Sequence, residues 1–359
     1  MKAVKVLIAG AGITGCAIAS ELKRFASALV NTSVEIVVWE KADRTGGRIM
    51  TFKLPENVEC FADLGCQYVS VTPQSRTRFS RFYDQLEREG LLVPMQARIE
   101  GSNPYSGNDV SDFVCPLGNS AIVDYFLQQS RATLKTNCSV ESIESTSNNQ
   151  FIVQSGSSGV TESNVDVVVL TMPIPLIDGI RLNGLLAEER AKMRTMHPVE
   201  YSSRYALALF FPDRCDVGLD FGFRFLDDDI LRYIEVDNIK RNQRDKPSAV
   251  VMHSTWQFGQ KHLQSSLLEA EKLMLERFHI VFPSVPRTDF RKIHQWRYSQ
   301  VRTQKEGSER LGYCDLRNQT GFLPGVFCAG DGFTFSSMDG CFESASQVCE
   351  AIFKRISDR

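Results

Sequence analysis

The chain has 359 residues, of which 43% are hydrophobic and 23% are charged, and its formal net charge is -2. This length exceeds the size at which one hydrophobic core stops growing, so it predicts two domains or one large, elaborated domain. The nearly balanced charge gives no global positive field, which argues against a nucleic-acid partner. No run approaches the ~18 apolar residues that a membrane-spanning helix needs, so we expect no membrane partner.

Ten cysteines are spread along the chain without a CxxC pair. This spacing predicts neither a zinc ribbon nor a thioredoxin-like centre, and we expect no metal site. Scattered cysteines suit a reducing compartment. The first twenty residues could be mistaken for a signal peptide, but their glycines have the spacing of a phosphate-binding turn. We therefore expect a cytoplasmic protein, although the even count leaves disulfides open.

The first forty residues predict a strand, a helix and a second strand. Residues 4–9 are a short apolar run that ends at a glycine, as in a strand buried on both faces of a parallel sheet. A helix is expected over 14–25 and a second β-branched strand over 34–39. This βαβ unit is typical of nucleotide-binding folds.

Three glycines, Gly10, Gly12 and Gly15, form a G-x-G-x-x-G turn between the first strand and the helix. Such a turn lets a pyrophosphate approach the helix N-terminus, where free N–H groups and the helix dipole favour negative charge. Glu40 ends the second strand, where its carboxylate can bind an adenosine ribose and disfavours a 2′-phosphate. The alternative is a glycine-rich turn in an ordinary α/β domain.

The later elements are predicted from periodicity and breakers. Helices are expected over 76–90 and 119–129, paired strands over 150–169, and a central strand over 165–171 before two prolines. Further on come strands over 204–211 and 249–254, then an amphipathic helix with Leu267, Ala270, Met274 and Phe278 on one side. The chain closes with a strand over 325–329 and a helix over 341–356.

Two further features indicate FAD rather than NAD as the resident cofactor. Gly46, Gly47 and Arg48 follow Glu40 and add a second glycine pair with a cation able to reach the pyrophosphate. Asp331 follows the last strand and resembles the flavoprotein aspartate that binds the ribityl chain. Gly340 is expected to open the last helix, whose unpaired N–H groups would stabilise an anionic reduced flavin.

Eight segments, in order and along nearly the whole chain, resemble the renalase family of flavin oxidases. They are GAGITG, GGR, DLGCQYVSVTP, VVVLTMPIP, YSSRYALALFF, VDNIKRN, QWRYSQV and CAGDGFTFSSMDGC. The resemblance implies an α/β fold with a Rossmann-type FAD-binding domain of the p-hydroxybenzoate-hydroxylase type. It also implies a second α+β substrate domain with a mixed or antiparallel sheet.

The same resemblance implies noncovalent FAD and oxidation of the 2- and 6-dihydro isomers of NAD(P)H to β-NAD(P)+, with O2 reduced to hydrogen peroxide. The residues implied to contact FAD are Thr14, Glu40, Arg48, Cys66, Gln67, Val140 and Asp331. Those implied to orient the substrate are Arg204, Asn238, His253 and Trp296. No residue is expected to act as a catalytic acid or base, because hydride loss from a dihydropyridine restores an aromatic ring.

Several of these assignments have structural alternatives. His253 lies within a strand and is as readily a hydrogen-bonded core residue, Arg204 could pair with a structural carboxylate, and Trp296 could serve packing. Trp256 is bulkier than is usual in that segment of renalases, which leaves the pocket wall open. The basic run over 240–246 is interpreted as a solvated loop, with phosphate steering as the alternative.

We expect a discontinuous FAD-binding domain over 1–75, 106–175 and 300–359, with a substrate domain over 76–105 and 176–299. An amine oxidase of the monoamine or polyamine type is the competing enzyme. A flavin-bearing signalling or interaction protein, acting through a surface such as residues 236–246, is the alternative outside enzymology. Monomer and dimer are both compatible with the sequence.

Overall fold

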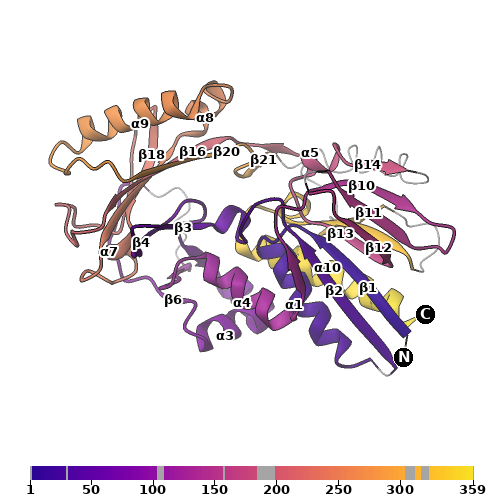
Figure 1. Ribbon diagram of the computed structural model, residues 1–359. Helices are drawn as coiled ribbons and strands as arrows, with labels where there is room; N and C mark the ends of the chain where they lie inside the picture. Colours follow the sequence, from indigo (N-terminus) through magenta and orange to yellow (C-terminus); the bar gives the residue numbers. More distant parts are fainter. Residues whose placement is uncertain are drawn as a thin grey trace. The chain divides into compact units, whose positions relative to one another are not determined.

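The computed structural model describes residues 2–29, 31–102, 109–156, 158–183, 199–303, 312–316 and 323–358. The chain divides into two compact units, which are drawn in Figure 1. The first unit comprises Met1–Gly47, Ile122–Glu200 and Thr303–Arg359, and the second comprises Arg48–Ala121 and Tyr201–Arg302. Both units therefore contain segments that are distant in sequence.

The first unit is built on a six-stranded sheet in the order β22-β23-β13-β1-β2-β9. Strand β1 pairs in parallel with β2 on one side and with β13 on the other, and β13 pairs in parallel with β23. All four residues of β13 are buried, as expected for a central strand covered on both faces. The strands are β1 (Lys2–Ala9), β2 (Thr32–Trp39), β9 (Thr133–Lys135), β13 (Val167–Leu170), β22 (Tyr313–Asp315) and β23 (Gly325–Ala329).

Two long helices, α1 (Ile13–Ala26) and α10 (Met338–Ser357), pack together in the first unit, near the indigo and yellow ends of the chain in Figure 1. The rings of Phe25 and Phe353 stack with centroids 4.9 Å apart. Helix α10 begins at Met338, three residues before the predicted start, because the Ser337 side chain caps it.

A second sheet of the first unit has the order β12-β11-β10-β14. Its strands are β10 (Val140–Ser145), β11 (Phe151–Ser155), β12 (Thr161–Val165) and β14 (Arg181–Asn183). Ile143 and Phe151 of this sheet share one buried core with Leu7 and Val168 of the parallel sheet. The predicted paired strands over 150–169 are confirmed as the antiparallel pair β11 and β12.

The second unit is built on a largely antiparallel sheet in the order β20-β16-β19-β18-β17-β7. Helix α9 (Leu267–Val281) buries Met274 and Phe278 against Leu207 and Met252 on one face of this sheet. The strands are β7 (Ile99–Glu100), β16 (Arg204–Phe211), β17 (Phe223–Phe225), β18 (Leu231–Val236), β19 (Ser248–Ser254) and β20 (Arg291–Trp296).

Shorter elements complete the fold. The remaining strands are β3 (Thr51–Leu54), β4 (Asn57–Asp63), β5 (Val69–Val71), β6 (Val93–Pro94), β8 (Ser111–Val114), β15 (Glu200–Tyr201) and β21 (Val301–Thr303). The remaining helices are α2 (Pro73–Arg78), α3 (Ser80–Arg88), α4 (Ser120–Ser130), α5 (Ile174–Ile177), α7 (Asp237–Lys240) and α8 (Trp256–Lys261), with 3-10 turns η1 (Gly47–Ile49) and η2 (Asp331–Phe333). No helix in the described ranges combines the length and apolar character needed to cross a membrane.

The compact units differ from the predicted domains at four places. Residues 48–75, 106–121 and 300–302 lie in the second unit, and residues 176–200 lie in the first. Strand β4 explains the first difference, because its Cys60 and Ala62 share a core with Ala206, Ala208 and Val251 of the large antiparallel sheet. That packing joins segments far apart in sequence, which local patterns do not report.

Most predicted elements are present, with two informative differences. The single helix expected over 76–90 is two helices, α2 and α3, separated at Phe79, whose φ of -109° is not helical. Leu267 is 46% exposed, whereas Ala270, Met274 and Phe278 of the predicted stripe are buried. The apolar stripe of α9 therefore starts one turn later than predicted.

We predict that Phe278→Ala lowers the free energy of unfolding by about 3–5 kcal/mol, because it opens a cavity beneath α9. Leu268→Ala is the matched control on the same helix, where the side chain is 76% exposed. It should change the free energy of unfolding by less than about 0.5 kcal/mol. Chemical denaturation measures both, and equal losses would contradict the packing of α9.

Candidate functional site

The glycine turn after β1 is shaped by contacts within the chain. Gly10 has φ +114° and donates its N–H to the carbonyl of Trp39 at 2.7 Å. A Cβ at Gly10 would lie 2.5 Å from Thr171 Oγ1, and a Cβ at Gly15 would overlap the Gly10 carbonyl oxygen. Both positions therefore need glycine for the fold itself.

Gly12 is different, because nothing within the described chain requires a glycine there. Its φ of -87° suits any residue, and a Cβ would meet only the Cα of Gly47, at 4.0 Å. Gly12 is also the N-cap of α1, and no side chain caps that helix. The turn thus offers free space beside uncapped helix N–H groups, which fits the pyrophosphate of a dinucleotide.

The Glu40 carboxylate is fixed before any ligand binds. One of its oxygens accepts the Ala11 N–H at 2.8 Å, and the other accepts the Ala42 N–H at 2.9 Å. An ionised carboxylate has about four acceptor positions, so capacity remains for ribose hydroxyls. These contacts tie the end of β2 to the glycine turn.

Two further predicted contact residues lie in segments bonded to this region. Gly47 follows Gly46, whose N–H donates to the Ala11 carbonyl at 2.9 Å. Val140 follows Cys138, whose N–H donates to the Glu40 carbonyl at 2.9 Å. Thr14 is buried in the first turn of α1. The first unit therefore brings Thr14, Gly47 and Val140 close to the glycine turn and Glu40 in the folded chain.

The C-terminal motif reaches the same edge of the sheet. Because β1, β13 and β23 are parallel, their carboxyl ends lie at one edge, where ligands bind in open α/β sheets. Gly330 follows β23 with φ +129° and donates its N–H to Ser344 Oγ at 2.7 Å. Asp331 is buried and accepts a hydrogen bond from Ser336 Oγ. The structure thus brings the two nucleotide motifs of the chain to one edge.

The prediction for Gly340 was wrong in one respect. Gly340 is the third residue of α10 rather than its first, and its N–H donates to Ser337 Oγ at 3.1 Å. This N–H is therefore paired within the helix cap. A Cβ at Gly340 would overlap the Phe335 carbonyl oxygen, which accounts for the glycine.

Sequence reasoning missed Thr171, which directly follows β13. Its hydroxyl donates to the carbonyls of Ala9 at 2.9 Å and Gly10 at 3.2 Å. Its own carbonyl oxygen lies 3.6 Å from the position of a Cβ on Gly330. Thr171 links the two glycine turns, and its position at the end of a buried strand was the available signal.

In the second unit, three predicted substrate residues lie on one face of the large sheet. Arg204 of β16 is directly opposite Trp296 of β20, and His253 of β19 is opposite Ala206, two residues from Arg204. Since alternate residues share a face, all three side chains leave the sheet on the same side. Arg204 donates to the Ser254 carbonyl at 3.2 Å, and Trp296 Nε1 donates to the Leu64 carbonyl at 2.6 Å.

Tyr233 completes this face and was not predicted. It is opposite His253 in the β18–β19 pair, and the two rings stack with centroids 4.7 Å apart at 20°. The half-buried Tyr68 packs edge-on against Phe223 of the same sheet. The alternating pattern of LRYIEV could have predicted a strand that contains Tyr233. It could not have shown that this strand pairs with the strand of His253.

Cys66 and Gln67 follow β4 and Arg48 follows the glycine doublet. The Cys66 N–H donates to the Arg48 carbonyl at 2.9 Å, and the Arg48 side chain donates to the Ser299 carbonyl at 3.2 Å. Burial raises the pKa of the Cys66 thiol to about 12, and the thiol donates to the Tyr68 carbonyl. Cys66 is therefore neutral at physiological pH.

Asn238 makes contacts that favour a structural role. Its amide nitrogen donates to the carbonyls of Cys215 at 2.9 Å and Lys246 at 3.2 Å, and its oxygen accepts from Ser248 Oγ at 3.0 Å. These bonds fasten a loop to α7. A substrate-orienting role for Asn238 stays a prediction, and its geometry does not favour it.

Trp256 lies half-buried at the start of α8, with the Arg302 guanidinium 3.7 Å from its ring centroid. A cation over an indole face is a favourable electrostatic contact. The neighbouring Gln257 is exposed.

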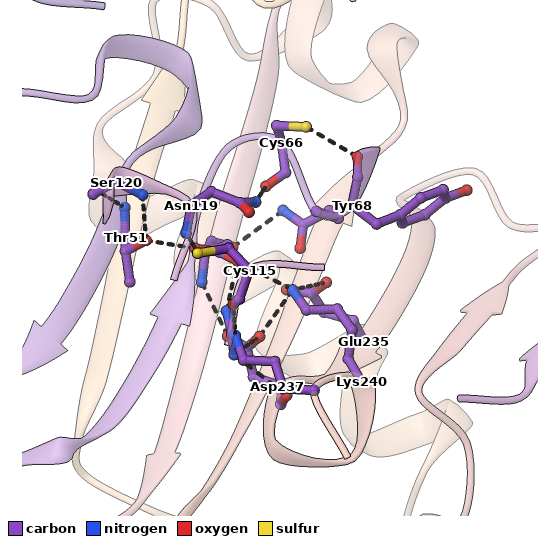
Figure 2. Close-up of polar contacts among 12 residues, drawn as sticks. Thr51, Cys66, Tyr68, Cys115, Asn119, Ser120, Glu235, Asp237 and Lys240 are labelled. Carbon is purple, nitrogen blue, oxygen red and sulfur yellow. Dashed lines mark hydrogen bonds and ion pairs between the residues drawn. The ribbon is translucent and has the colours of Figure 1, made fainter. Parts of the chain in front are cut away.

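Glu235 leaves β18 on the same side of the sheet as Tyr233 and belongs to a buried ion cluster, shown in Figure 2. One oxygen of the Asp63 carboxylate accepts from Thr51 Oγ1 at 2.6 Å and from the Asn119 N–H at 2.9 Å. The other accepts from Lys240 at 3.3 Å and Arg241 at 2.5 Å. Burial opposes ionisation of Asp63, but these two cations outweigh it and lower its pKa below the ordinary value.

The interpretation of residues 240–246 as a solvated loop was wrong for its first two residues. Lys240 and Arg241 are 1% and 5% exposed, and both also contact the carboxylate of Asp237. Their charges are therefore matched inside the protein and do not steer phosphate. This burial also removes residues 236–241 from the interaction surface considered above, while Arg244 and Asp245 are exposed.

Glu235 is the third acid of the ion cluster. One of its oxygens is 3.0 Å from Lys240 Nζ, and the other is enclosed without a partner in the described chain. Burial raises the pKa of the Glu235 carboxyl well above its ordinary value, and Lys240 offsets this only in part. Asp63 and Asp237 each contact both cations, and burial favours the protonated form of Glu235.

Within the described residues, no group of three or more His, Cys, Asp or Glu side chains is arranged to hold a metal ion. The predicted cofactor contacts lie in both units. Arg48, Cys66 and Gln67 belong to the second, together with all four predicted substrate residues.

Comparisons with known proteins agree with this site. The model of the NAD(P)-binding Rossmann-like domain matches residues 8–86, and that of the flavin containing amine oxidoreductases matches residues 73–353. The chain therefore belongs to the flavin-containing amine oxidoreductase family. It is an FAD-dependent oxidoreductase, and the glycine turn, Glu40 and Asp331 fit that cofactor.

The predicted resemblance to the renalases is confirmed. Renalase of Mus musculus is 33% identical over 358 residues, which cover 98% of this chain and 99% of that protein. Two solved structures share the fold at low identity. Cyclohexylamine oxidase from Brevibacterium oxydans IH-35A has a TM-score of 0.65 at 14% identity, covering 99% of this chain and 100% of that one. Putrescine oxidase bound to putrescine has a TM-score of 0.64 at 12% identity, covering 98% of this chain and 99% of that one.

We predict that Gly12→Ala and Gly15→Ala separate cofactor binding from folding. Gly12→Ala should leave the unfolding free energy of the FAD-free protein within about 0.5 kcal/mol and weaken FAD binding about tenfold or more, because its methyl group occupies the pyrophosphate space. Gly15→Ala should destabilise the FAD-free protein by about 1–3 kcal/mol, because its methyl group overlaps Gly10. Flavin fluorescence titration and denaturation measure the two effects. Unchanged FAD affinity in Gly12→Ala would place the pyrophosphate elsewhere.

We predict that substitution of Lys240 destabilises the protein strongly, whereas substitution of its neighbour Glu235 has little effect. Lys240→Met should cost about 3–5 kcal/mol, because it leaves buried carboxylates uncompensated. Glu235→Gln mimics the neutral acid and should cost less than about 1 kcal/mol near neutral pH.

The pH dependence of Glu235→Gln provides an independent check. Folded Glu235 keeps a proton that the unfolded chain releases above the ordinary pKa, so wild-type stability falls there by up to about 1.4 kcal/mol per pH unit from this group. The variant lacks this loss, so its stability relative to wild type should rise as the pH is raised above the ordinary carboxyl pKa. A constant difference would mean that Glu235 is ionised in the folded protein.

Proposed function

We propose that this protein oxidises the 2- and 6-dihydro isomers of NAD(P)H to β-NAD(P)+ and passes the electrons to O2. When bound, FAD supplies the hydride acceptor and the route by which two electrons reach O2, which with a solvent proton forms hydrogen peroxide. The support is the similarity to mouse renalase along 98% of the chain, since this is the reaction that the renalase resemblance implies.

One observation on the site supports this chemistry in particular. The titratable side chains at its centre are held neutral. Burial lowers the pKa of His253 to about 3, raises that of Cys66 to about 12, and raises that of Tyr233 well above its ordinary value. None of them is poised as a general base. A dihydropyridine needs none, because it becomes an aromatic pyridinium by losing hydride alone.

The role of the protein is then to hold the donor carbon in place. Arg204, His253 and Trp296 share one face of a rigid sheet, and positioning on such an element reduces the entropy lost on reaching the reactive geometry. We propose that these three residues orient the dihydronicotinamide.

Oxidation of an amine is the second candidate. Tyr68, Tyr233 and Trp296 give the same face an aromatic lining, which suits a neutral amine, and the matching family is described by amine oxidation. The two candidates differ in what reduces the flavin.

We predict that 2-dihydro-NAD and 6-dihydro-NAD each bleach the flavin absorbance of the purified holoenzyme under anaerobic conditions, and that a panel of primary and secondary amines does not. Admitting O2 should restore the absorbance and release one hydrogen peroxide per substrate. Ordinary 4-dihydro NADH is the control for nonspecific reduction. Rapid bleaching by an amine alone would reverse the order of the two candidates.

The proposed noncovalent attachment is tested on the same preparation. Flavin should stay in the supernatant after the protein is denatured and precipitated, since none of the cysteines is proposed as a tether. Flavin retained by the precipitate would contradict this attachment.

A further inference from the structure

The contact between Gln67 and His253 fixes a chemical detail of the site. Gln67 follows β4 and His253 lies in β19, and both side chains are buried. Gln67 Nε2 is 2.9 Å from His253 Nε2. Two nitrogens at this distance must be one donor and one acceptor.

The surroundings of Gln67 decide which nitrogen donates. The same Nε2 atom is 2.5 Å from the Gly65 carbonyl oxygen and 3.1 Å from that of Asp63. An amide nitrogen donates two hydrogens and accepts none. The three neighbours therefore share these two hydrogens, and a proton on the histidine nitrogen would face them without an acceptor. A reversed amide would place an oxygen against two carbonyl oxygens, which the network forbids. The Gln67 amide therefore donates, and His253 Nε2 accepts.

It follows that a neutral His253 carries its proton on Nδ1. Within the described part of the chain, no hydrogen bond to this nitrogen is present, and the residue is 3% exposed. The ring as a whole is held by stacking on Tyr233.

The charges around the ring also keep it neutral. Burial is the largest cause of its low pKa, and Arg204 of β16, Lys240 of α7 and His294 of β20 add to it. Tyr233 of β18, whose pKa is raised, is a neutral neighbour. His253 thus offers a neutral N–H donor across the physiological pH range.

We propose that Gln67 is a positioning residue that locks His253 in the Nδ1–H form, and that this N–H binds the carboxamide oxygen of the substrate. The second part rests on the proposed function, and the first does not. A neutral donor aligns a carbonyl oxygen without transferring a proton. This suits a reaction in which only hydride leaves the substrate. A histidine whose Nε2 lone pair is already occupied also has no free basic nitrogen.

The tautomer can be read directly in the substrate-free holoenzyme by long-range 1H–15N NMR of labelled histidines. The chain has five histidines, so His253→Asn identifies the signals of interest by their loss. The expected result is a protonated Nδ1 and a bare Nε2 that do not titrate between about pH 5 and about pH 8. A protonated Nε2, or titration in this range, would overturn the proposal.

Gln67→Glu tests the role of the amide. Its carboxylate accepts rather than donates, so a proton should move to His253 Nε2 and the ring should begin to titrate. Gln260→Glu, an exposed amide on α8 in the same unit, is the matched control and should leave the His253 signals unchanged. The visible flavin spectrum verifies that each variant retains FAD. An unchanged tautomer in Gln67→Glu would remove Gln67 from this role.

Kinetics test the substrate contact separately. His253→Leu should raise the KM for the dihydronicotinamide about tenfold with a smaller effect on kcat, because a binding hydrogen bond is lost. His253→Asn, which retains an N–H donor near Nδ1, should raise it less. Equal effects would refute the carboxamide contact while leaving the tautomer result intact. If neither dihydro isomer is oxidised, the proposed function fails, whereas the NMR result still decides the role of Gln67.

Discussion

The buried carboxylate of Asp63 is the interaction on which the second unit most depends. A lone buried carboxylate costs several kcal/mol, so it must be matched where it lies. Asp63 is matched by a hydroxyl, a backbone N–H and two cations, drawn from three separate segments. Its own N–H donates to Asp237 at 3.0 Å. The segment that continues to Gln67 therefore leaves a fixed point, and the Asp63 carbonyl itself holds the Gln67 amide.

The ion cluster lies beside the proposed substrate residues. It pairs two cations, Lys240 and Arg241, with Asp63 and Asp237, and Glu235 contacts Lys240. The His253 and Tyr233 rings lie on the same side of the sheet as Glu235, and burial disfavours the charged form of both rings. Paired charges thus hold these segments in place, while FAD carries the redox chemistry.

In the first unit, the site for the dinucleotide is formed mainly by backbone groups. Its turns pack so closely that Gly10 and Gly15 have no room for a side chain, and Thr171 bonds across the junction. Of the three glycines in the turn, Gly12 is the one that no internal contact requires to be glycine. Main-chain N–H groups and one oriented carboxylate, Glu40, then present a surface for a dinucleotide. Backbone groups suit this task because phosphates are bound by position and dipole rather than by side-chain shape.

The sequence by itself determined what depends on near neighbours. The strand, glycine turn and helix follow from dihedral preferences and periodicity within a few residues. Glu40 follows from its place at the end of the second strand, and the Asp331 motif from its resemblance to other flavoproteins. The tertiary structure decided what depends on distant partners. Lys240 and Arg241 form an ordinary basic run until Asp63, 177 residues away from Lys240, buries and neutralises them. Likewise, Tyr233 meets His253 only through the register of β18 and β19, and the Gly340 N–H was lost to a serine cap. Pairing and burial between remote segments set these features, and no local pattern encodes them.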